Sequence, residues 1–109
     1  MKKLICVLLL AGMIATSVIA DTFFIRNGTG SWTFYYVYVS DSRSSEWGED
    51  LLGRDVLEPG ETLRIETTIP LSGTTWDIMA IDQDGDTYTL PATRISSNQT
   101  ITITLSDID

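Results

Sequence analysis

The chain of 109 residues has no histidine and a single cysteine, Cys6, which lies in the first ten residues together with both lysines. From residue 21 onward there is no Cys, Lys or His at all. A Ser-His-Asp hydrolase and a thiol nucleophile are therefore excluded for that region. Zinc, copper and iron also lose their usual nitrogen and sulfur ligands. We expect a protein that is not an enzyme and that needs no cofactor, with calcium as the one ion its oxygen ligands would suit.

The first twenty residues have the three-part pattern of a secretory leader. Met1-Lys2-Lys3 is positively charged, residues 4–14 are apolar apart from Gly12, and Ala20 precedes the expected cleavage site. The apolar run is shorter than the ~20 residues that span a bilayer, so we predict no membrane anchor. We predict a signal peptide at residues 1–20, a single domain at residues 21–109, and a bacterial protein that is secreted or periplasmic.

The region after the leader is strongly acidic. It holds all 15 acidic residues and only five arginines, which gives a formal charge of −10. Affinity for nucleic acid comes from basic residues that neutralise phosphates, so nucleic acid is excluded as a partner. An anionic membrane surface is excluded for the same reason. The negative charge could serve to bind a cationic partner, to bind calcium, or only to keep the protein soluble. Repulsion between acidic copies favours a monomer.

Short runs of Thr, Val, Ile and aromatic residues alternate with Gly, Asn, Asp and Ser clusters along this region. This pattern predicts an all-β fold, a single small antiparallel β-sandwich of about seven strands. We expect Asp84-Gly85 to close a hairpin that pairs Ile81 with Tyr88, and Pro91 to weaken any continuation as a central strand. Residues 32–40 are apolar on both faces, which predicts a central strand. The clearest strand candidates are residues 22–26, 32–40, 63–68, 76–82, 86–90 and 100–105.

Residues 41–59 form an unusually long connection for so small a domain. Its apolar side chains Trp47, Leu51 and Leu52 must be buried against the rest of the domain. We predict that residues 46–52 form one helical turn that buries them. Loops of this length are usually functional or disordered, and the apolar content argues against disorder. We therefore expect this loop and the nearby hairpin tip to contact a partner.

The acidic residues of these two segments suggest calcium as an alternative. Residues 82–86 place three aspartates at alternate positions, but Thr87 stands where an EF-hand needs Gly and Thr93 where it needs Glu. The competing interpretation is a solvated hairpin tip in which Asp favours the turn. The residues that would hold the ion are Asp82, Asp84, Asp86, Glu49 and Asp50.

An aromatic row on residues 32–40 supports two interpretations. Trp32, Phe34, Tyr36 and Tyr38 alternate along the strand and would share one face. We expect most of the row in the core, with Trp47 and Trp76, because a large exposed apolar patch is costly unless it binds something. The alternative is a carbohydrate-binding platform on which sugar rings stack. Its candidate ligand-binding residues are Trp47, Trp32, Tyr36 and Tyr38.

Two asparagines lie in the glycosylation pattern Asn-x-Ser/Thr, at Asn27-Gly28-Thr29 and at Asn98-Gln99-Thr100. The leader indicates a bacterial protein, so we interpret both segments as turns.

Several short segments together resemble a group of small exported bacterial domains of unknown function. The pattern runs N-x-T-G, Y-V-S, W-G-x-D-L-L-G, L-x-P-G, W-D-I and D-x-D-G-D-x-Y, from Asn27 to Tyr88. The W-G-x-D-L-L-G block is its most specific part. The resemblance implies a compact β-rich domain and assigns no activity and no catalytic residue. We expect a binding module that contacts an unknown protein or an envelope polysaccharide.

Overall fold

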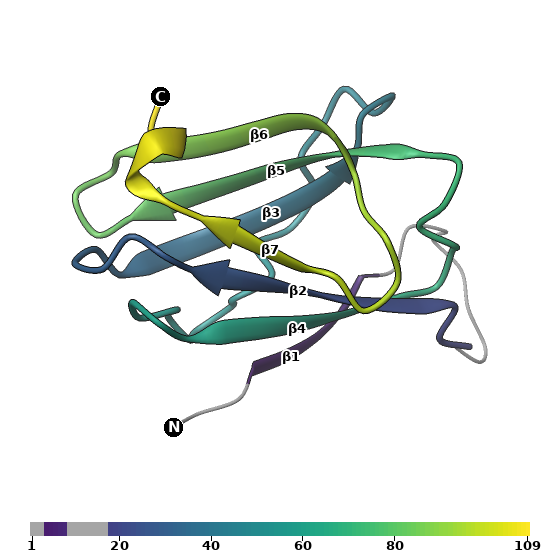
Figure 1. Ribbon diagram of the computed structural model, residues 1–109, viewed down its shortest axis with the longest axis horizontal. Helices are drawn as coiled ribbons and strands as arrows, with labels where there is room; N and C mark the ends of the chain where they lie inside the picture. The colour runs from purple at the N-terminus through teal and green to yellow at the C-terminus, as the bar shows by residue number, and fades with distance from the viewer. Residues whose placement is uncertain (1–3, 9–17) are drawn as a thin grey trace.

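The computed structural model describes residues 4–8 and 18–109, and it shows a small fold built almost entirely of β-strands (Figure 1). Two sheets enclose one hydrophobic core. In chain order the strands are β1 (Leu4–Leu8), β2 (Asp21–Asn27), β3 (Phe34–Asp41), β4 (Thr62–Thr67), β5 (Thr75–Asp82), β6 (Thr87–Arg94) and β7 (Thr100–Ile103), followed by the short 3-10 helix η1 (Leu105–Asp107). The prediction of a small all-β fold is confirmed.

The first sheet has the order β1-β4-β2-β7 and the second the order β3-β5-β6. From residue 21 to residue 109 there are six strands in two groups of three, not seven. The predicted antiparallel pairing holds for most strands from residue 21 onward, but β2 pairs with β7 in parallel. The chain crosses from the second sheet back to the first between β6 and β7, and so enters beside β2 running in the same direction.

The predicted leader, residues 1–20, is described only at residues 4–8 and 18–20. Residues 4–8 form β1, which pairs in parallel with β4 at the outer edge of the first sheet. Residues 1–3 and 9–17 lie outside the described part, and the cleavage before Asp21 stays a prediction. In the described residues no helix is both long and apolar enough to cross a membrane.

β3 is an edge strand and not the central strand that its sequence predicts; β5 is central. The long loop covers the outer edge of β3. The backbone N–H groups of Phe34 and Leu57 each donate to the carbonyl oxygen of the other at 2.9 Å, and Leu51 N–H donates to Val37 O at 2.8 Å. The helical turn predicted at residues 46–52 is wrong, because this segment instead extends along β3 and buries Leu51 and Leu52.

The hairpin between β5 and β6 differs from its predicted register by one residue. Ala80 pairs with Tyr88 and Ile81 with Thr87, so Tyr88 points into the core with Ala80 and does not pair with Ile81 as predicted. The turn is longer than the two residues expected, and Gly85 takes a left-handed φ of 85° in it. β6 continues past Pro91 to Arg94, which its position at the edge of the sheet permits.

The core is one cluster to which both sheets and the long loop contribute. Trp76 from β5, Phe23 from β2 and Tyr88 from β6 are among its largest fully buried side chains. The expectation that Trp76 belongs to the core is confirmed. Burial of large aromatic rings is what allows so short a chain to form a core without a disulfide.

Candidate functional site

The aromatic residues of β3 divide between the core and the outer surface. The pairing of β3 with β5 shifts register between Phe34 and Tyr36, which leaves Tyr35 as an extra residue in a β-bulge. Phe34 and Val37 are fully buried, whereas Tyr36 is 44% exposed and Tyr38 is half-buried. The expectation that most of the row is core therefore fails for Tyr36 and Tyr38.

Tyr36, Tyr38 and Trp47 form a contiguous row of rings, which we call the aromatic row. The rings of Tyr36 and Tyr38 are nearly parallel, at 7°, with centroids 6.4 Å apart. Trp47 comes from the long loop and lies against Tyr38 with a centroid distance of 6.4 Å and a tilt of 50°. Trp47 is half-buried by this contact and is not among the buried residues of the core, contrary to the expectation for it.

The outer face of the second sheet continues from the aromatic row across β5 to β6. Tyr36 pairs with Ile81 of β5, which in turn pairs with Thr87 of β6. In the same way Tyr38 pairs with Met79, and Met79 pairs with Thr89. These four residues of β5 and β6 are all half-buried. The face therefore changes from aromatic on β3 to aliphatic on β5 and to hydroxyl-bearing on β6.

A carboxylate lies at each side of this face. Asp50 Oδ1 accepts hydrogen bonds from Val37 N–H at 2.9 Å and from Leu52 N–H at 3.0 Å, which fix the loop to β3. The pKa of Tyr38 is raised by burial first and then by the negative charge of Asp50. At the far side, Asp109 Oδ2 accepts hydrogen bonds from the hydroxyls of Thr87 and Thr89 at 2.7 and 2.6 Å.

The structure does not bring Trp32 into this row. Trp32 is half-buried in the turn after β2, where its carbonyl oxygen accepts hydrogen bonds from Asn27 Nδ2 at 2.7 Å and Thr29 Oγ1 at 2.9 Å. No ring contact joins it to Tyr36 or Tyr38 within residues 18–109. Of the four predicted ligand-binding residues, three therefore gather at one place.

The five acidic residues considered for calcium serve different structural purposes. Asp82 is buried, its Oδ1 accepts hydrogen bonds from the N–H groups of Asp84 and Asp86, and its Oδ2 accepts one from Tyr88. Asp84, Asp86 and Glu49 are exposed, and Asp50 holds the loop against β3. Across residues 4–8 and 18–109 no group of three or more such side chains is placed to hold a metal ion. Calcium binding stays a prediction that no gathered ligand set supports.

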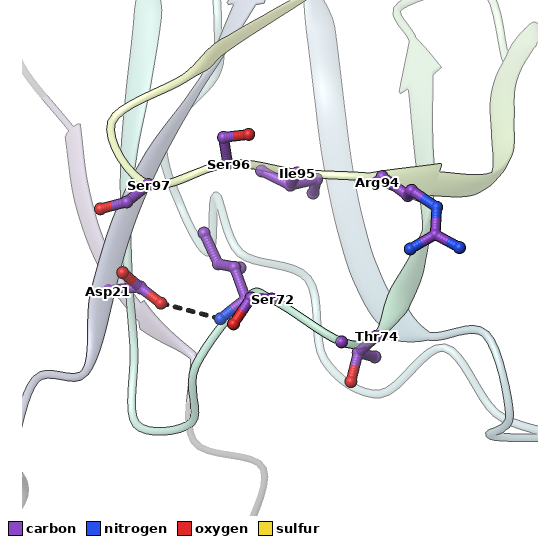
Figure 2. A pocket seen from close by; sticks show the side chains of 9 residues that line it. Asp21, Ser72, Thr74, Arg94, Ile95, Ser96 and Ser97 are labelled. Atoms are coloured by element: carbon purple, nitrogen blue, oxygen red, sulfur yellow. Dashed lines mark hydrogen bonds between the residues drawn. The ribbon is translucent and has the colours of Figure 1, made fainter.

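A hollow of about 400 Å³ with a mixed polar and apolar lining lies at the end of the molecule where β2 begins and β6 ends (Figure 2). Asp21 and Arg94 stand at its opposite ends, and Asp21 Oδ2 accepts a hydrogen bond from Leu71 N–H at 2.8 Å. Serines 72, 96 and 97 and Thr74 line it between them. The sequence does not reveal this hollow, because its lining appears there only as Ser and Thr clusters that equally indicate turns.

Comparison of the chain with protein family models, with curated proteins and with solved structures gives no match.

Proposed function

We propose that the chain is an exported, non-enzymatic binding module that holds a neutral polysaccharide on the aromatic row. The observation that carries this proposal is the outward placement of three aromatic side chains, from a strand and from a separate loop, in mutual contact on one face. A fold short of core volume would gain free energy by burying these rings. Their exposure therefore has a cost that a ligand would offset.

The chemistry of the face favours a sugar over other ligands. Aromatic rings present flat apolar surfaces to the C–H faces of pyranose rings. Hydroxyls and carboxylates, here Thr87, Thr89 and Asp50, supply the hydrogen bonds that sugar hydroxyls need. The formal charge of −10 in residues 21–109 disfavours nucleic acids and acidic polysaccharides, so we propose a neutral glycan.

Preorganisation of the row supports the same proposal. Trp47 is held by the loop that pairs with β3, and the loop is itself fixed through the two hydrogen bonds of Asp50. A ligand that meets a rigid aromatic surface loses less free energy to the ordering of side chains.

The test is a glycan array, followed by affinity electrophoresis in a gel that contains the neutral polysaccharide bound most strongly on the array. We expect Tyr36→Ala and Trp47→Ala each to weaken binding about tenfold, which is about 1.4 kcal/mol and is within what burial of one ring's apolar surface contributes. Tyr35→Ala is the matched control, because Tyr35 is 46% exposed on the same strand but belongs to the bulge and not to the row. A silent array, or equal losses in the Tyr35 and Tyr36 variants, would contradict the proposal.

A further inference from the structure

The edges of the two sheets are protected to different degrees. The long loop covers β3, and β6 is covered by a bridge between Tyr88 and Ile108 and by the bond from Asp109 N–H to Thr87 O. β7 is short, with four residues, which itself limits pairing. β4 has six residues, and within residues 4–8 and 18–109 its outer edge has only β1 beside it.

The hydrogen bonds of β2 show which backbone groups of β4 face this outer edge. Phe24 N–H donates to Gln99 O, so the even-numbered residues of β2 bond toward β7, and Asn27 N–H donates to Glu61 O, so the odd-numbered ones bond toward β4. In an antiparallel ladder the odd-numbered residues of β4 therefore bond back to β2. The residues of β4 whose N–H and C=O groups face the outer edge are Thr62, Arg64 and Glu66.

β1 shows what this edge accepts. Its five apolar residues pair with β4 in parallel, from Leu4 opposite Leu63 to Leu8 opposite Thr67 (Figure 1). On the side away from the core, Arg64 and Glu66 form an ion pair at 3.3 Å, so the two charges of the edge offset each other. An apolar strand therefore meets no net charge there.

We propose that, once residues 1–20 are removed, the outer edge of β4 binds an extended apolar segment of a partner protein as a parallel strand. Strand addition satisfies the edge-facing backbone groups that cleavage would expose. A second copy fits less well, because a two-fold axis through this edge would pair β4 with β4 in antiparallel fashion, and each copy carries a formal charge of −10. This edge belongs to the sheet opposite the aromatic row, so strand addition here is independent of the proposed glycan binding and shares with the proposed function only the export of the chain.

The experiment uses the processed protein purified from an exporting host, with its N-terminus established by intact mass. The probe is a fluorescent peptide of residues 2–9 with Cys6→Ser, and binding is measured by anisotropy. Because Arg64 pairs with Ile5, its backbone groups bond to the residues that flank Ile5, one of which is residue 6. A peptide with Cys6→Pro lacks that N–H, and we expect it to bind at least tenfold more weakly.

On the protein side, Arg64→Pro removes an edge-facing N–H without removing a bond to β2, whereas Arg64→Ala removes only the side chain. We expect at least a tenfold loss for the proline variant and less than threefold for the alanine variant. Thermal melting verifies that each is folded, and Glu66→Pro replaces Arg64→Pro if that variant is not. Equal binding of the serine and proline peptides, or no binding, would overturn the proposal. Retention of residues 1–20 after export, or a peptide-free dimer that Arg64→Pro dissociates, would do so too.

Discussion

The hydroxyl of Tyr88 donates a hydrogen bond of 2.8 Å to Oδ2 of Asp82, and both side chains are buried. The other oxygen of Asp82 accepts the N–H groups of Asp84 and Asp86 across the hairpin tip. Tyr88 also lies against Phe34, with ring centroids 5.2 Å apart. The carboxylate of Asp82 thus joins the tip of the hairpin to the aromatic part of the core.

Replacement of Tyr88 by Phe keeps the ring and removes this bond. Oδ2 of Asp82 is then buried without its donor, and we expect the free energy of unfolding to fall by about 1–3 kcal/mol. Urea denaturation followed by tryptophan fluorescence measures the change. Asp84→Asn, at an exposed position of the same turn, is the control and should change stability by less than about 0.5 kcal/mol. A Tyr88→Phe variant with the same free energy of unfolding as the wild type would show that the hydrogen bond contributes nothing.

The same pair predicts a loss of stability at alkaline pH. The pKa of Tyr88 is raised, by burial first and then by the hydrogen bond to Asp82 and the charges of the three aspartates of the tip. An unfolded tyrosine ionises near pH 10, so the stabilisation is complete below about pH 10 and is lost as pH rises toward the folded pKa. Unfolding free energies measured from about pH 8 to about pH 11 should fall more steeply for the wild type than for Tyr88→Phe. If the free energy of unfolding falls equally steeply with pH in both proteins, the alkaline loss of stability does not come from Tyr88.

The sequence predicted where most strands lie but misplaced some of their faces. Side chains alternate along a strand with a period of two, so one extra residue moves every later side chain to the opposite face. Such a residue occurs in β3 at Tyr35, and the turn around Gly85 is longer than the two residues expected. Neither is apparent from the alternation of apolar residues. Most of the aromatic row was consequently predicted as core, and Tyr88 was paired with Ile81 where the structure pairs it with Ala80.

The pattern that resembles exported bacterial domains marks mainly the framework, although it also includes two residues of the proposed binding surface. Asn27, Asp50 and Asp82 each belong to it, and each uses its side chain to bind the backbone of a turn or loop. Gly53 and Gly60 take left-handed φ values of 59° and 88°. Of the aromatic row, Tyr38 and Trp47 lie within the pattern and Tyr36 does not. A pattern governed by such local hydrogen bonds predicts the fold better than it predicts a ligand.

Asn27 gives a severe test of that framework. It is fully buried, its Nδ2 donates to the carbonyl oxygens of Trp32 and Leu57, and its Oδ1 accepts from Thr29. Asn27→Asp would set a carboxylate oxygen against two carbonyls, and we expect a loss of about 3–5 kcal/mol, the range for an uncompensated buried charge. Asn98→Asp is the matched control, because Asn98 is the exposed asparagine of the second Asn-x-Thr segment and should tolerate the change. Urea denaturation of both variants provides the comparison, and equal losses would refute the role given to Asn27.

Asp109 links the end of the chain to the hydroxyl-bearing side of the proposed binding face. Its pKa is lowered, first by the hydrogen bond from Thr89 and then by that from Thr87, because both stabilise the carboxylate. A depressed pKa contributes stability that is present above the ordinary value near 3.8 and is lost as pH falls through the folded value. Asp109→Ala should therefore lower the melting temperature at neutral pH, and the difference from the wild type should shrink as the solution is acidified. Calorimetric melting across the acid range measures this difference, with Asp84→Ala, at an exposed aspartate of the turn between β5 and β6, as a control that leaves Thr87 and Thr89 paired. A difference that stays constant with pH would mean that the ionised carboxylate does not hold these two threonines in place.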